Sequence, residues 1–158
     1  MYQVGICYTV NSVTSKKDKE LFMKDLFFYW IHYPIEPYDC WWGNDIKCIS
    51  RDRNKVDAAW ENEGEELSEQ SDRIDKFESE IMITSSKVWI IFSYDAEDPD
   101  WAEIKFLGNT REECLEWWGE NWTDYSSYNP EEGEEAPEFD ERYGDRNHGL
   151  LMKEMEIV

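Results

Sequence analysis

The pattern of apolar and polar residues near the N-terminus predicts a strand followed by a helix. Between residues 2 and 10, apolar side chains alternate with polar or small ones, which is typical of an amphipathic strand. Ser15 can then cap a helix that ends at Pro34, because the apolar residues between them recur every three or four positions. The inward stripe of this expected helix consists of Phe22, Met23, Leu26, Phe27 and Trp30.

A second helical pattern covers residues 55–81, after a loop that leads into a short strand near residues 46–50. Most positions outside its apolar seam are acidic or polar, so this helix is expected to be acidic on its exterior. Gly64 could divide it in two. The seam consists of Val56, Trp60, Leu67, Ile74, Phe77 and Ile81.

The next segments predict a hairpin and a capped helix. Apolar residues lie on both sides of 87–94, as in a central strand, and 101–108 alternates as the second strand of the hairpin. Thr110 and Glu113 form a T-x-x-E capping box, which marks the start of a helix. The inward stripe of that helix consists of Leu115, Trp118 and Trp122.

This order of elements favours a single α+β domain over residues 1–158. Residues 124–149 are expected to form an acidic, Pro/Gly-rich loop, and 150–158 an edge strand, with a short helix as the alternative. The expected architecture is a mainly antiparallel sheet with helices packed on one face. If residues 46–80 are treated as an insertion, the remaining order matches the ferredoxin-like (split βαβ) arrangement with an inserted acidic helix.

Charge is distributed unevenly along this chain. The 158 residues carry 37 Asp and Glu against 16 Lys and Arg, a formal net charge of −21. Residues 1–60 hold eight acids and eight bases, so the whole excess lies in residues 61–158. Such segregation indicates an electrostatic face rather than uniform solubilisation. The aromatic fraction of 16% argues against a disordered chain.

The sequence favours a cytoplasmic location without membrane association. It contains no run of eighteen apolar residues, and its first residues lack the features of a signal peptide. The four cysteines form no CxxC pair, so we expect reduced and mostly buried thiols.

No catalytic signature is found, so we expect neither an enzyme nor a cofactor. The two histidines, His32 and His148, stand in no recognisable motif, and the common nucleotide-binding and hydrolase patterns are missing. Residues 95–100 offer four carboxylates to a hard cation, but the glycine and final glutamate of an EF-hand loop are not in place. Residues 131–141 could hold a metal only loosely. A Ca/Mg-binding acidic protein stays open as an alternative.

Carboxylates after Trp60 have a spacing that suits a mimic of nucleic acid, whose duplex carries about one charge per 1.7 Å of axis. Residues three or four apart on a helix lie about 5–6 Å apart at Cβ, and alternate strand residues about 6.6 Å apart. Trp117 adds a candidate apolar anchor, since Trp is enriched at binding hot spots. The candidate acids are Glu61, Glu65, Glu66 and Glu69 in the second helix, and Glu131, Glu132, Glu134, Glu135, Glu138 and Asp140 in the loop.

This composition resembles that of the inhibitors that phages encode against restriction or CRISPR effectors. The leading hypothesis is an acidic protein inhibitor that mimics nucleic acid and occludes the basic surface of a nucleic-acid-binding partner, without binding nucleic acid itself. An immunity protein that neutralises a basic nuclease toxin would share these features. An acidic surface that only keeps the protein in solution is the plainest alternative.

Overall fold

The computed structural model places helices and strands in a mixed α and β arrangement. It describes residues 16, 24–34, 42–63, 71–93, 95–96, 103–126, 129–139 and 149–158. The elements are, in chain order, β1 (Asp25–Pro34), β2 (Trp42–Ser50), α2 (Arg53–Glu63), β3 (Ser71–Glu78), β4 (Lys87–Ser93), β5 (Asp95–Ala96), β6 (Ile104–Gly108), α3 (Arg111–Asn121), the 3₁₀ helix η2 (Trp122–Tyr125) and β7 (Leu150–Glu156).

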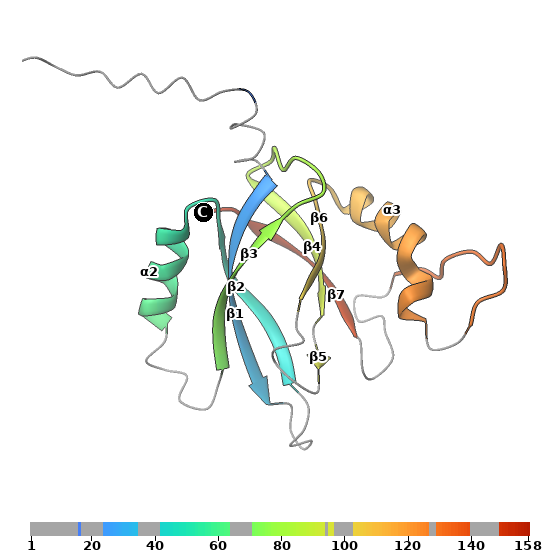
Figure 1. Cartoon of the computed structure of the whole chain (residues 1–158), viewed down its shortest axis with the longest axis horizontal. Helices are drawn as coiled ribbons and strands as arrows, with labels where there is room; N and C mark the ends of the chain where they lie inside the picture. The colour runs from blue at the N-terminus through green and yellow to red at the C-terminus, as the bar shows by residue number, and fades with distance from the viewer. Residues whose placement is uncertain are drawn as a thin grey trace, which may run out of the picture.

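The strands form two antiparallel sheets. The first has the order β3-β1-β2-β5 and the second the order β6-β4-β7. β1 pairs with β2 and β3, and β4 pairs with β6 and β7, so these two are the main central strands. β2 also pairs on both sides, but with β5 over only two residues. Figure 1 shows the two sheets packed face to face, with α2 outside the first sheet and α3 outside the second. The described part of the chain thus has four layers in the order helix, sheet, sheet, helix.

The largest hydrophobic cluster lies between the two sheets. It takes alternate residues from each central strand: Leu26, Phe28 and Trp30 from β1, and Val88, Ile90 and Phe92 from β4. The intervening residues face the outer layers. Tyr29 packs in a cluster with Val56 of α2, and Ile91 in a cluster with Trp118 of α3. Each central strand is buried on both faces, which explains why its sequence is almost continuously apolar.

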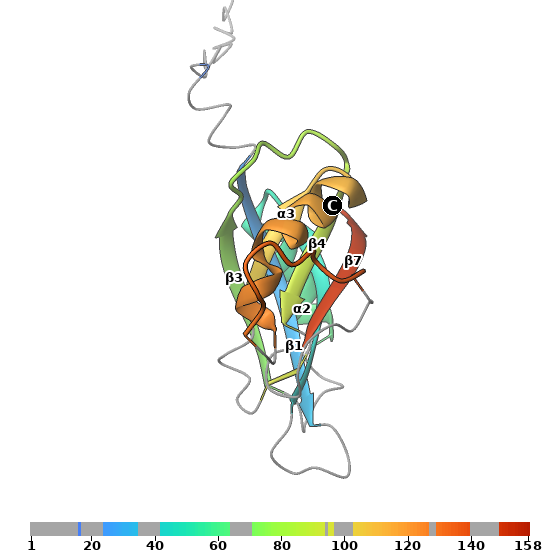
Figure 2. The same cartoon turned by 90° about the vertical axis from the view of Figure 1, so that its right-hand side faces the viewer.

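The α+β class predicted from the sequence is confirmed, but the ferredoxin-like arrangement is not. A single sheet with helices on one face was expected, whereas the strands divide between two sheets and the helices cover opposite outer faces. Figure 2, which views the molecule from the α3 side, shows the second sheet directly behind that helix. The division was not readable from element order, because order along the chain does not specify which strands share a sheet.

The helix predicted before Pro34 is wrong from Asp25 onward, where β1 begins. Leu26 and Trp30, expected on one helical stripe, instead face the cluster between the sheets. A strand that is apolar on both faces also satisfies three- and four-residue spacing, so the pattern could not separate the two structures. Phe22, Met23 and the strand expected at residues 2–10 lie outside the described residues.

The acidic helix predicted over residues 55–81 is only partly correct. α2 ends at Glu63, next to Gly64, and β3 begins at Ser71. Ile74 and Phe77, three residues apart, were placed on one helical seam. In the strand they face opposite sides, Phe77 towards the cluster between the sheets and Ile74 towards the cluster beneath α2. An odd spacing changes face in a strand but not in a helix.

The second half of the chain follows the sequence prediction closely. β4 is a central strand that pairs with β6 in the expected hairpin, and β7 is an edge strand of the same sheet. The strand expected near 46–50 is present as β2, although it begins earlier, at Trp42. Within the described ranges, no helix combines the length and apolar character needed to cross a membrane.

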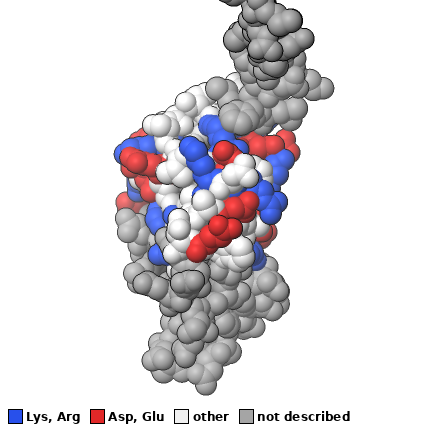
Figure 3. Space-filling view, turned by 90° about the vertical axis from the view of Figure 1, so that its left-hand side faces the viewer, with Lys and Arg blue, Asp and Glu red and all other residues white. Residues whose placement is uncertain are grey.

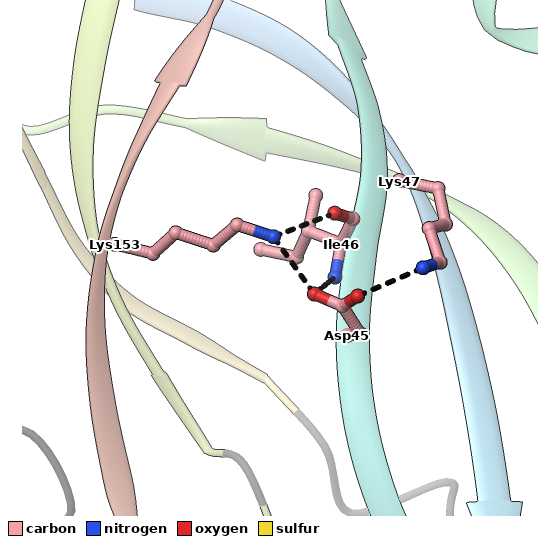
Figure 4. Close-up of polar contacts among 4 residues, drawn as sticks. All are labelled: Asp45, Ile46, Lys47 and Lys153. Atoms are coloured by element: carbon pink, nitrogen blue, oxygen red, sulfur yellow. Dashed lines mark hydrogen bonds and ion pairs between the residues drawn. The ribbon is translucent and has the colours of Figure 1, made fainter.

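A polar contact joins the edges of the two sheets. Lys153 of β7 reaches across to Asp45 of β2 at 2.9 Å and also donates to the carbonyl oxygen of Ile46 at 3.3 Å (Figure 4). Lys47 contacts the other oxygen of the same carboxylate at 3.0 Å. Further along the boundary between β2 and the end of the chain after β7, the backbone N–H of Val158 donates to the carbonyl oxygen of Ile49 at 3.0 Å. These contacts hold β7, and with it the second sheet, against β2.

Candidate partner-binding surface

The start of α3 is held firmly by its capping residues. The Thr110 hydroxyl accepts a hydrogen bond from the backbone N–H of Glu113 at 3.2 Å, as the capping box predicts. The Glu113 carboxylate accepts from the backbone N–H of Asn109 at 2.6 Å, one residue before the cap. The Asn109 side chain also donates to the carbonyl oxygen of Met82 at 2.9 Å. The first turn of α3 is therefore connected to the loop before β4.

The two sides of α3 differ sharply in character. Cys114 and Trp118 are buried against the second sheet. On the opposite side, Glu112, Glu116 and Glu120 are exposed and follow one another every four residues. This spacing separates them by about 6 Å along the helix axis. The outer side of α3 is thus a row of carboxylates.

Residues 129–139, called the acidic strap here, lie against α3. The indole N–H of Trp118 donates to the carbonyl oxygen of Pro137 at 2.9 Å. The ring of Phe139 is buried and meets the Trp118 ring edge to face, with 5.2 Å between ring centroids. Figure 2 shows the strap running beside α3. These contacts give the strap a defined position even though it contains no helix or strand.

A tight turn shapes the outer part of the acidic strap. The backbone N–H of Glu134 donates to the carbonyl oxygen of Glu131 at 3.1 Å, and the Glu134 carboxylate accepts from the backbone N–H of Glu131 at 3.0 Å. Gly133 has a φ of +86°, which a residue with a side chain rarely adopts. The turn and the residues after it present exposed carboxylates, those of Glu131, Glu132, Glu134, Glu135 and Glu138.

Among the described residues, acids are most concentrated in the segment that contains α3, η2 and the strap. Residues 111–139 hold ten acids and one base, Arg111. By contrast, α2 holds three acids and two bases, and its pair Arg53 and Asp57 lies 3.7 Å apart. Figure 3 looks at the α2 side and shows Lys and Arg interspersed with Asp and Glu among the coloured residues. One base cannot neutralise ten carboxylates, so the surface made by α3 and the strap is strongly anionic.

The structure brings together part of the set predicted from the sequence. The five strap glutamates lie on the surface formed with α3, whereas exposed Glu61 belongs to α2, on the opposite outer face (Figure 1). Trp117 is half-buried and stacks on Phe106, with centroids 5.7 Å apart and an interplanar angle of 17°. The remaining candidates, Glu65, Glu66, Glu69 and Asp140, lie outside the described residues.

Sequence reasoning missed the carboxylates of the helix itself. Glu112, Glu116 and Glu120, together with exposed Asp124 in η2, extend the anionic surface of the strap. Their regular spacing of four residues was visible in the sequence. It was overlooked because the same segment carries the tryptophans that were assigned to the core.

The acidic surface is open rather than enclosed. A depression of about 570 Å³ is lined by Asn129, Glu131, Glu132, Gly133 and Glu134 and faces solvent. In the ranges that the structure covers, no three His, Cys, Asp or Glu side chains are grouped so as to hold a metal ion. Most of the acidic segment 95–100, the other cation candidate, lies outside those ranges. The surface therefore suits contact with a macromolecule better than enclosure of a small ligand.

No family model, no curated protein and no solved structure matches this chain.

Proposed function

We propose that this protein is an acidic inhibitor that mimics nucleic acid and occludes the basic surface of a nucleic-acid-binding partner. The partner class is a nuclease or defence effector of the restriction or CRISPR kind, and the location is the cytoplasm. The observation that carries the proposal is the ten-to-one excess of acids over bases in residues 111–139. The inhibitor acts by occupying the partner's groove, without catalysis or a cofactor.

The attachment of the acidic strap to α3 supports this proposal. Like charges repel one another, so a flexible acidic loop would extend into solvent and would lose conformational entropy on binding. Here the strap is fastened by Trp118 and Phe139, and the α3 carboxylates stand on a capped helix. A preformed anionic surface binds a cationic groove with little ordering cost, and long-range attraction speeds the encounter.

Competition with duplex DNA tests the proposal directly. Fluorescent DNA is bound to a restriction endonuclease, to a Cas9-type effector and to a basic nuclease toxin domain, and the protein is titrated into each complex at low and at high salt. We expect it to displace DNA from one of the first two, with an affinity that weakens at least tenfold as salt rises. Displacement from the toxin domain alone would instead favour the immunity-protein alternative.

A matched pair of variants identifies the binding surface. Changing Glu131, Glu132, Glu134 and Glu135 to Gln removes four charges from the strap, and Gln keeps a carbonyl oxygen for the bond from the Glu131 backbone. The control changes Asp57, Asp75, Glu78 and Glu80 to their amides, which removes four charges from α2, β3 and the residues just after β3. Only the strap variant should weaken inhibition. An affinity for the partner that is the same in the strap variant and the unmodified protein, and the same at low and high salt, would exclude the proposal.

A further inference from the structure

Two half-buried aromatic residues lie at the edge of the anionic surface. Trp117 stacks on the buried ring of Phe106, and Tyr125 lies tilted against Trp117 with 6.0 Å between centroids. Tyr125 also packs against Trp118 at 6.4 Å. Both rings belong to the periphery of the cluster beneath α3, so they are fixed in place while part of each stays in solvent.

The protein already places one of its own cations on this aromatic pair. The Lys105 ammonium lies 5.6 Å from the centroid of the Tyr125 ring, within the usual limit of about 6 Å for a cation–π contact. The same ammonium forms an ion pair with Glu103. This internal contact indicates that the local field and ring orientation favour a positive group.

Two exposed carboxylates lie close to the aromatic pair along the chain. Glu120 lies one helical turn after Trp117 and Asp124 directly precedes Tyr125, and both are exposed. Burial raises the pKa of Tyr125, and the charges of Glu103 and Asp124 raise it further. The negative potential that disfavours a phenolate at this position also favours an approaching cation.

We infer that Trp117 and Tyr125, flanked by Glu120 and Asp124, accept an arginine side chain of the basic partner. A guanidinium is planar and weakly hydrated, so it can stack on an indole while its N–H groups bond a carboxylate. A lysine ammonium is more strongly hydrated and gains less from the ring. This inference rests on the proposed function and adds to it the residue type that the surface selects.

The test compares oligo-arginine and oligo-lysine peptides of equal length, bound to the full chain and measured by calorimetry at low salt. The quantity of interest is the ratio of the two dissociation constants. Trp117→Leu and Tyr125→Leu should each reduce the preference for arginine about threefold, the size of one exposed cation–π contact. Trp117→Phe keeps an aromatic ring against Phe106 and should give a smaller reduction, which provides a variant that folds if Trp117→Leu does not.

The control is Trp60→Leu, which removes a 41% exposed tryptophan from α2 on the other side of the molecule and should leave the ratio unchanged. The strap variant with four Gln substitutions should weaken both peptides equally. An unchanged ratio in folded Trp117 and Tyr125 variants would overturn the arginine assignment alone. If neither peptide binds the unmodified protein, the proposed function is overturned as well.

Discussion

The indole N–H of Trp118 donates a hydrogen bond to the carbonyl oxygen of Pro137, 2.9 Å away and nineteen residues further along the chain. The ring of Trp118 is buried, so this bond satisfies a polar group that would otherwise be costly to remove from water. Because Pro137 belongs to the acidic strap, this bond, together with the packing of Phe139 on Trp118, fastens an acidic loop to the hydrophobic layer beneath α3.

Trp118→Phe should loosen the strap while keeping an aromatic ring in the core. We expect the free energy of unfolding to fall by about 1–3 kcal/mol, because a buried hydrogen bond and part of a buried ring are lost. Denaturant titration measures the change, and cleavage by a glutamate-specific protease should become faster within residues 129–139. Trp60→Phe on α2 is the control and should change stability by less than about 0.5 kcal/mol. Unaltered cleavage in the Trp118 variant would show that the strap is held by other contacts.

Asp45 should contribute to stability in a pH-dependent way. Burial alone would raise the pKa of Asp45, but hydrogen bonds and charges from Lys153 and Lys47 hold it below the ordinary value of 3.8. A carboxyl whose folded pKa is lowered stabilises the protein above its unfolded pKa, and this contribution is lost as the pH falls through the folded value. Asp45→Asn should therefore cost about 1 kcal/mol near neutral pH, and its difference from the unmodified protein should shrink below pH 3.8.

The exposed pair of Arg53 and Asp57 on α2 provides the comparison for the contact between Asp45 and Lys153. Its side chains are 65% and 40% exposed, so Asp57→Asn should cost no more than about 0.5 kcal/mol. Chemical denaturation of both variants from neutral to acidic pH measures how the free energy of unfolding of each depends on pH. A constant difference between Asp45→Asn and the unmodified protein at all pH values would contradict the role assigned to Lys153.

Two glycines near α3 should respond in opposite directions to alanine. A Cβ at Gly108 would meet the Thr110 carbonyl oxygen at 3.0 Å and the Cys114 sulfur at 3.2 Å, so Gly108→Ala must displace the helix cap. We expect a loss of about 1–3 kcal/mol. Gly119 lies on the exposed side of α3 with nothing within 4 Å of its added Cβ, so Gly119→Ala should stabilise by about 0.5–1 kcal/mol. In thermal unfolding, the midpoint should fall for Gly108→Ala and rise for Gly119→Ala.

Cys114 should be unreactive in the folded protein. Burial raises the pKa of its thiol to about 12, and the charge of Glu113 acts in the same direction. At pH 9 alkylation by iodoacetamide should be at least about a hundredfold slower than in the unfolded chain, since the thiolate is the reactive form. A raised thiol pKa stabilises the fold at low pH, and this contribution is lost as the pH rises from 9.0 towards 12. Mass spectrometry of the peptide that contains Cys114 measures the rate, and rapid labelling would contradict its burial.

Sequence reasoning succeeded where the interactions are local. The cap at Thr110 depends on a glutamate three residues later, and the hairpin of β4 and β6 on two segments close in the chain. The end of the chain, for which an edge strand was preferred to a short helix, forms β7. Each of these patterns is complete within a short stretch, so its physical cause can be read without knowing the partners.

Only the tertiary structure decided the identity of β1 and the shape of the acidic surface. Leu26 and Tyr29 could lie in a helix or a strand, and burial between a sheet on one side and α2 on the other selects the strand. By itself the sequence determined how many carboxylates follow Trp60 and where along the chain they occur. The assembly of the strap and α3 carboxylates into one surface depends on the contacts of Trp118 with Pro137 and Phe139, since contacts between distant segments arise from packing and leave no local pattern.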